Sequence, residues 1–108
     1  MGPDDRARQA IDAINAISGR HPGYRAAHAK GTLCSATFTP APEARSLSRA
    51  AHLRDGPVRA HVRFSNGSGD PAAPDFEPRE GRGMATKFYL PDRTTTDIVG
   101  ITLPAFFV

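Results

Sequence analysis

The chain has 108 residues, a length that allows at most one domain with a small hydrophobic core. Hydrophobic residues make up 39% and charged residues 23%, which is the composition of a globular rather than a disordered chain. The net charge of +3 permits nucleic-acid binding without indicating it. The single cysteine, Cys34, excludes an intrachain disulfide, and no apolar run is long enough to span a membrane. We therefore predict a cytoplasmic protein with neither a nucleic-acid nor a membrane partner.

The N-terminal stretch has the pattern of an amphipathic helix. Pro3 and Asp4 resemble a helix start, and Gly19 ends the pattern. Apolar side chains recur between them at helical spacing, at Ala7, Ala10, Ile11, Ile14 and Ile17. A helix of about fifteen residues is marginal by itself, so we predict an arm helix within residues 1–19 whose apolar stripe needs a partner surface.

Residues 25–38 lack helical periodicity and carry few large side chains, so we predict a strand there, after a turn at residues 21–23. Small residues leave room where another backbone or a ligand approaches closely. Sequence spacing alone favours a tightly packed strand without a ligand, and the ligand-binding alternative stays open at this point.

Residues 43–55 are predicted to form a second short helix, closed by Gly56 and Pro57. Its inward positions would be Leu47, Ala50, Ala51 and Leu53. We expect this helix to serve as a connection.

The clearest periodic signal lies at residues 58–65, which predict a strand with one apolar and one polar face. The apolar positions are Val58, Ala60, Val62 and Phe64. The polar face carries Arg59, His61, Arg63 and Ser65, and such a face commonly just meets solvent. Two further strands are predicted, one over residues 84–90 and one that begins near Thr95.

The stretch from 66 to 83 is rich in Gly, Pro, Asp and Glu and is too long for a simple hairpin turn. Long loops in compact domains are usually functional or belong to a larger body. Its glycines match no dinucleotide or phosphate-loop fingerprint, so we assign turn roles to Gly67, Gly69, Gly81 and Gly83.

The spacing and sequence context of the candidate residues argue against several kinds of functional site. The four histidines include no pair at helical i, i+4 spacing and no companion cysteine pair, so a metal held by protein ligands alone is not expected. The serines lack a nucleophile-elbow context, and no run of aromatic residues matches an RNA-binding strand. A metal, if present, would enter within a cofactor.

Several short motifs occur in the order and approximate spacing found in haem catalases. They are Arg25-x-x-His28-Ala29-Lys30-Gly31, Val62-Arg63-Phe64-Ser65, Arg82-Gly83-Met84-Ala85-Thr86-Lys87-Phe88-Tyr89, Asp97-Ile98-Val99-Gly100 and Pro104-Ala105-Phe106-Phe107-Val108. Residues 20–108 therefore resemble the N-terminal portion of that family. The resemblance implies an α+β fold, in which the arm helix of residues 1–19 precedes part of an antiparallel β-barrel that is cut off at its C-terminal end.

The resemblance also implies roles for individual residues around a haem. His28 would be the distal histidine and Ser65 its hydrogen-bonding partner, while Arg25 and Arg63 would contact the haem propionates. Ala27 would lie over the ring, and the distal pocket would be lined by Phe106 or Phe107. These residue types suit the chemistry, because a neutral imidazole of fixed tautomer can pass a proton between two peroxide oxygens. Arginine pairs with carboxylates in bidentate fashion.

Two departures from the larger catalases refine this interpretation. Ile101 stands where they carry an asparagine, and the Ile-Thr-Leu-Pro sequence at 101–104 resembles the smaller catalase-related peroxidases. The resemblance then implies reduction of hydrogen peroxide or an organic peroxide by a small organic electron donor. No metal ligand is predicted, because the family's proximal tyrosine lies in a part that this chain does not reach. Tyr24 follows Arg20 at the family's spacing, but a Pro-Gly pair between them argues against a helix.

Two functions from different classes stay open. One is a haem-dependent, peroxide-decomposing oxidoreductase of which the chain holds the distal half. The other is a truncated, non-catalytic relative or a subunit that associates with another chain. We expect the isolated chain to be weak or inactive, and its open strand edges to favour association, including homo-oligomers.

Overall fold

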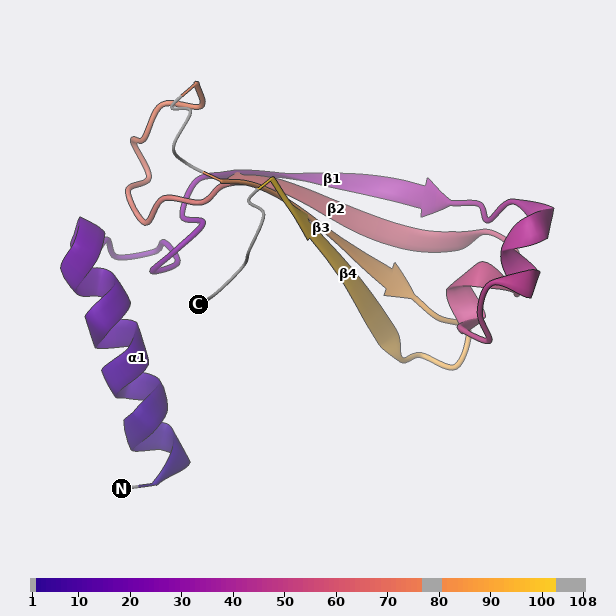
Figure 1. The fold of residues 1–108 in the computed structure, drawn as a ribbon, viewed down its shortest axis with the longest axis horizontal. Helices are drawn as coiled ribbons and strands as arrows, with labels where there is room; N and C mark the ends of the chain where they lie inside the picture. The colour runs from indigo at the N-terminus through magenta and orange to yellow at the C-terminus, as the bar shows by residue number, and fades with distance from the viewer. Residues whose placement is uncertain (1, 77–80, 103–108) are drawn as a thin grey trace. The chain divides into compact units, whose positions relative to one another are not determined.

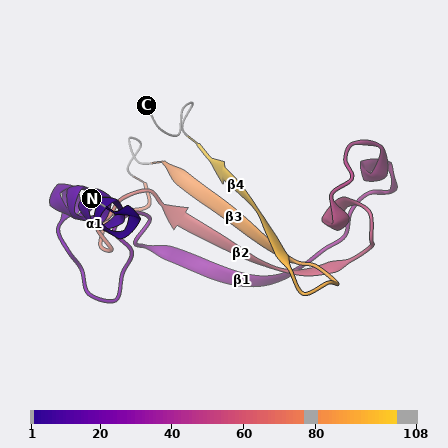
Figure 2. The ribbon, with the colours of Figure 1, turned by 90° about the horizontal axis from the view of Figure 1, so that it is seen from below.

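The computed structural model describes residues 2–76 and 81–102, which form one helix and one antiparallel sheet. The helix is α1 (Pro3–Ser18), and the strands are β1 (Gly31–Phe38), β2 (Val58–Asn66), β3 (Arg82–Tyr89) and β4 (Thr95–Ile101). The strands are neighbours in the order β1-β2-β3-β4 (Figure 1). Figure 2 shows β1 and β4 at opposite edges of this sheet, which is not closed. The predicted α+β fold with an incomplete barrel is therefore confirmed.

Helix α1 begins and ends as its sequence predicts. Pro3 occupies the first turn, where a missing N–H costs nothing, and the backbone N–H of Gly2 donates to Asp5 Oδ2 at 3.2 Å. Gly19 ends the helix with a φ of 84°, which glycine adopts without strain. No residue of α1 is buried, and Ile17 is 82% exposed. The described residues thus do not supply the partner surface that the apolar stripe requires.

The strand predicted over 25–38 forms only from Gly31 onward, and residues 25–30 are irregular. His28 has a φ of 51°, in the left-handed region, which interrupts an extended chain. The segment still runs beside the end of β2, since the N–H of Asn66 donates to the carbonyl of Lys30 at 3.1 Å.

The helix predicted over 43–55 is wrong: two short 3-10 helices, Pro42–Ser46 and Ala51–Leu53, occupy this stretch. Between them Ala50 is extended, with a ψ of 133°, and its N–H donates to Ser48 Oγ at 3.0 Å. Such a local side-chain bond competes with helical hydrogen bonding. Leu47, expected to face inward, is 81% exposed.

A small core lies against the beginning of β2 and the end of β3. Val58, Ala60 and Phe88 are buried, and Phe38 meets Phe88 edge-to-face with ring centroids 5.0 Å apart. The predicted alternation of β2 is confirmed at Val58 and Ala60, but Phe64 is 50% exposed.

The chain divides into two compact units. The first contains the described residues within 2–32 and 64–83 together with 101–102, and the second contains 33–63 and 84–100. The predicted division between residues 19 and 20 stays a prediction. Within the described ranges, no helix has both the length and the apolar character needed to cross a membrane.

Candidate functional site

The central feature of the first unit is a hydrogen bond between two side chains that are 37 residues apart in sequence. His28 Nδ1 lies 2.9 Å from Ser65 Oγ, and both residues are half-buried. The backbone around His28 is held to the chain beyond β2: the N–H of His28 donates to the carbonyl of Gly67 at 3.2 Å, and that of Ala29 to Ser68 at 3.1 Å. The imidazole is therefore fixed through both its backbone and one ring nitrogen.

His28 adopts a backbone conformation that a residue with a Cβ rarely takes. Its φ of 51° costs on the order of 1 kcal/mol relative to a right-handed or extended conformation. The two backbone hydrogen bonds to Gly67 and Ser68 hold this conformation in place. Strained residues of this kind cluster at functional sites, because the surrounding structure must maintain them.

Gly83 makes room for the His28–Ser65 pair. A Cβ at this position would lie 2.7 Å from Ser65 Oγ and 3.2 Å from both Cε1 and Nδ1 of His28. The turn role assigned from the sequence is wrong for Gly83, which lies inside β3. A glycine inside a strand pattern signals close approach of other atoms, and this signal was present in the sequence.

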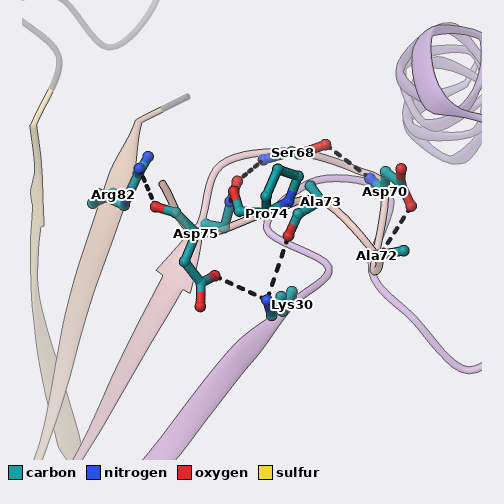
Figure 3. Close-up of polar contacts among 9 residues, drawn as sticks. Lys30, Ser68, Asp70, Ala72, Ala73, Pro74, Asp75 and Arg82 are labelled. Atoms are coloured by element: carbon teal, nitrogen blue, oxygen red, sulfur yellow. Dashed lines mark hydrogen bonds and ion pairs between the residues drawn. The ribbon is translucent and has the colours of Figure 1, made fainter. Parts of the chain in front are cut away.

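A chain of local hydrogen bonds shapes the loop that follows β2. Asn66 is 3% exposed, and its Nδ2 donates to the carbonyl of Pro74 at 3.0 Å while its Oδ1 accepts from the N–H of Ser68 at 3.0 Å. Ser68 Oγ in turn accepts from the N–H of Asp70 at 3.0 Å, and Asp70 Oδ1 from that of Ala72 at 2.9 Å (Figure 3). These bonds fix the same backbone that accepts from His28 and Ala29.

Charged residues lie at the edge of this unit. Lys30 Nζ lies 3.0 Å from Asp75 Oδ1 and donates to the carbonyl of Ala73 at 3.4 Å (Figure 3). The guanidinium of Arg82 donates to the backbone carbonyl of Asp75. Lys30, Arg82 and Ser65 are among the residues that line a hollow of about 300 Å³. The side chain that holds His28 is thus reached from a hollow of mixed charge.

The other predicted site residues are only partly brought together. Arg25 is exposed and Ala27 half-buried, and both belong to the same unit as His28. Arg63 lies two residues before Ser65 on β2, but it belongs to the other unit. Phe106 and Phe107 lie outside the described residues.

Metal coordination by side chains alone is not supported in the described part of the chain. No group of three or more His, Cys, Asp or Glu side chains there could hold a metal ion. The bond to Ser65 orients one nitrogen of the His28 imidazole, and an imidazole oriented in this way can accept and return a proton at its other nitrogen.

The structure contains an N-terminal helix, an open antiparallel sheet, and a strained histidine that is bonded to a serine of β2. These features define an incomplete catalase-like α+β fold. The family model of catalase matches residues 8–108, so the chain belongs to the catalase family, whose members decompose peroxide.

The chain is similar to several relatives. It is 56% identical to a catalase-related peroxidase of Mycolicibacterium paratuberculosis over 90 residues, which cover 83% of this chain and 28% of that protein. It is 31% identical to a catalase-related peroxidase of Synechococcus elongatus over 100 residues, or 93% of this chain and 29% of that protein. A catalase of Blumeria hordei is 36% identical over 88 residues, 78% of this chain and 12% of that protein. The chain spans less than a third of the length of these relatives.

Proposed function

We propose that this chain carries the distal half of a haem-dependent peroxidase site of the catalase-related type. The observation that carries the proposal is the 2.9 Å bond between His28 Nδ1 and Ser65 Oγ, in a chain that belongs to the catalase family. The similarity to two catalase-related peroxidases favours reduction of hydrogen peroxide or an organic peroxide by a small organic donor over rapid disproportionation.

The residues around the pair suit the distal side of a haem. One imidazole nitrogen is engaged by Ser65, and Gly83 keeps the space beside the ring free of a side chain. Arg25 and Arg63 would pair with the propionates, Ala27 would lie over the ring, and the pocket would be lined by Phe106 or Phe107. Haem, when bound, would supply the iron and the electrons that cleave the peroxide bond.

His28 would move a proton at Nε2. To accept a proton from peroxide there, the imidazole must carry its own proton on Nδ1, so Nδ1–H donates to Ser65 Oγ. Nε2 would take the proton from one peroxide oxygen and return it to the other, which makes the departing oxygen a better leaving group. Ser65 would hold the tautomer and the ring orientation, and the backbone bonds from His28 and Ala29 to Gly67 and Ser68 fix the segment that carries the ring.

A second candidate is a non-catalytic relative or a subunit that requires another chain, and the unclosed sheet favours it. The edges β1 and β4 are the surfaces through which we propose association with another chain.

A haem titration of the purified chain separates the two candidates. The enzymatic proposal expects a Soret band and peroxide-dependent oxidation of a phenolic donor, and this oxidation should fall by about 100-fold in His28→Ala. His21→Ala is the matched control, because it also removes an imidazole, one whose Nε2 donates to the Ser18 carbonyl at 2.9 Å. Undiminished turnover in His28→Ala would reject the role of His28. Absence of a Soret band would favour the non-catalytic candidate.

A further inference from the structure

A second pair of side chains, outside the site proposed above, joins β2 to β3 in the second unit. His61 Nδ1 lies 2.7 Å from the hydroxyl oxygen of Tyr89, and both residues are half-buried. Their rings meet edge-to-face, with centroids 5.3 Å apart and an interplanar angle of 83°. Nothing in the proton transfer at His28 uses this pair.

A cation completes the arrangement around the phenol. The guanidinium carbon of Arg59 lies 4.9 Å from the centre of the Tyr89 ring. Lys87 of β3 and Asp97 of β4 form an ion pair with each other, in which Lys87 Nζ lies 2.9 Å from Asp97 Oδ1. Tyr89 therefore has an imidazole nitrogen at its hydroxyl and a fixed positive charge over its ring.

This environment suits a phenol that loses an electron and a proton together. Removal of an electron from a phenol makes its O–H strongly acidic, so oxidation is easiest where a base already accepts the hydrogen bond. His61 Nδ1 is such a base in the tautomer that carries its proton on Nε2, and it lies close enough to the hydroxyl that no solvent molecule is required. The Arg59 guanidinium disfavours positive charge on the ring, and this opposes loss of the electron before the proton.

We propose that Tyr89 and His61 form a proton-coupled one-electron donor site. Tyr89 gives one electron to a one-electron oxidant generated from peroxide, and its phenolic proton moves to His61 Nδ1, which leaves a neutral phenoxyl radical beside an imidazolium. A small organic donor then returns one electron to the phenoxyl oxygen, and His61 returns the proton. The peroxide origin of the oxidant rests on the proposed function, whereas the proton-coupled step does not.

The composition of the chain makes this step measurable. The sequence has only two tyrosines and no tryptophan, and the other tyrosine, Tyr24, is 57% exposed. Tyr24→Phe therefore leaves Tyr89 as the single phenol, and Tyr89→Phe leaves Tyr24. Cys34 is exposed and would also be oxidised, so both proteins should carry Cys34→Ser.

The experiment is flash photo-oxidation of the full chain by a ruthenium tris-bipyridine complex with a sacrificial acceptor, followed by the phenoxyl absorption and electron paramagnetic resonance. It needs no haem, so its result is independent of the haem titration. Tyr89 should be oxidised at a rate that does not depend on buffer concentration, because its base is built in. Oxidation of Tyr24 should accelerate as the concentration of a basic buffer rises.

Two variants of His61 identify the base. His61→Phe should slow Tyr89 oxidation by about 100-fold and make it depend on buffer. His61→Asn should behave in the same way, because an amide accepts a hydrogen bond but does not hold the transferred proton at neutral pH. In proteins that keep His61, the oxidation rate of Tyr89 could depend on buffer concentration as strongly as that of Tyr24, and this result would overturn the proposal. The comparison does not require the His61→Phe or His61→Asn protein to fold. An unchanged rate in a folded His61→Asn protein would also overturn it.

Discussion

The Cα of Gly83 lies so close to Ser65 that a Cβ would stand 2.7 Å from Ser65 Oγ. Real Cβ atoms essentially never approach an oxygen so closely, so a side chain at position 83 must displace the Ser65 hydroxyl, the His28 ring, or the strand itself. The bond between His28 and Ser65 thus depends on the lack of a side chain at a third residue, Gly83.

Gly83→Ala is expected to break the bond between His28 and Ser65. The nitrogen-15 and proton shifts of the His28 ring should change toward those of a mixture of tautomers, and the free energy of unfolding should fall by about 1–3 kcal/mol because of overpacking. Gly100→Ala is the control, since the nearest atom to its new Cβ would be the Met84 carbonyl oxygen at 3.9 Å.

A double-variant cycle with Ser65→Ala tests the origin of the effect. Removal of Oγ takes away the atom that the new methyl group meets first, so Gly83→Ala should cost less in that background. Equal costs in the two backgrounds would show that the strain lies elsewhere than at Ser65.

Asn66→Ala is expected to destabilise the protein far more than Asp75→Asn. The buried Asn66 amide satisfies the Pro74 carbonyl and the Ser68 N–H, and loss of these bonds should lower the free energy of unfolding by about 2 kcal/mol. The carboxylate of Asp75 is 74% exposed, so loss of its pair with Lys30 should cost less than about 1 kcal/mol and less still at high salt. Denaturant titrations of both variants measure this ranking. Equal losses would contradict it.

His52→Phe is expected to stabilise the second unit. His52 is 6% exposed and stacks on Phe88 with centroids 4.5 Å apart, yet neither of its ring nitrogens has a hydrogen-bond partner in the described part of the chain. Replacement of an unsatisfied buried polar ring by an apolar one should raise the free energy of unfolding by about 1 kcal/mol. His61→Phe should have the opposite sign, because it removes a bond to Tyr89. A lower thermal midpoint for His52→Phe would show that these nitrogens have partners.

Thr94→Val is expected to raise the pKa of Asp92. In the turn between β3 and β4, the Thr94 hydroxyl and then the Thr94 backbone N–H donate to the Asp92 carboxylate and hold its pKa below the usual range. A carboxyl whose pKa is lowered by folding stabilises the native state above its unfolded pKa. This stabilisation is lost as pH falls through the folded value. Carboxyl-carbon NMR titration measures the change, and Thr95→Val should leave the Asp92 titration in place.

The sequence by itself determined the elements that depend on residues close together in the chain. Helix α1 follows from Pro3, the first-turn acids and Gly19, and β2 follows from the alternation that begins at Val58. The same local reasoning failed at 43–55, where the N–H of Ala50 donates to the Ser48 hydroxyl and Ala50 leaves the helical conformation. The ordered motifs also identified the catalase family, which the family match confirms.

Only the tertiary structure decided which side chains meet. The bond from His28 to Ser65 spans 37 residues and that from His61 to Tyr89 spans 28, so both depend on how distant segments of the chain are paired and not on local preference. The positive φ of His28 and the close approach of Ser65 to Gly83 exist because neighbouring backbones hold them. Residue types can suggest such contacts, but the positions of the atoms follow from packing between segments that the sequence separates.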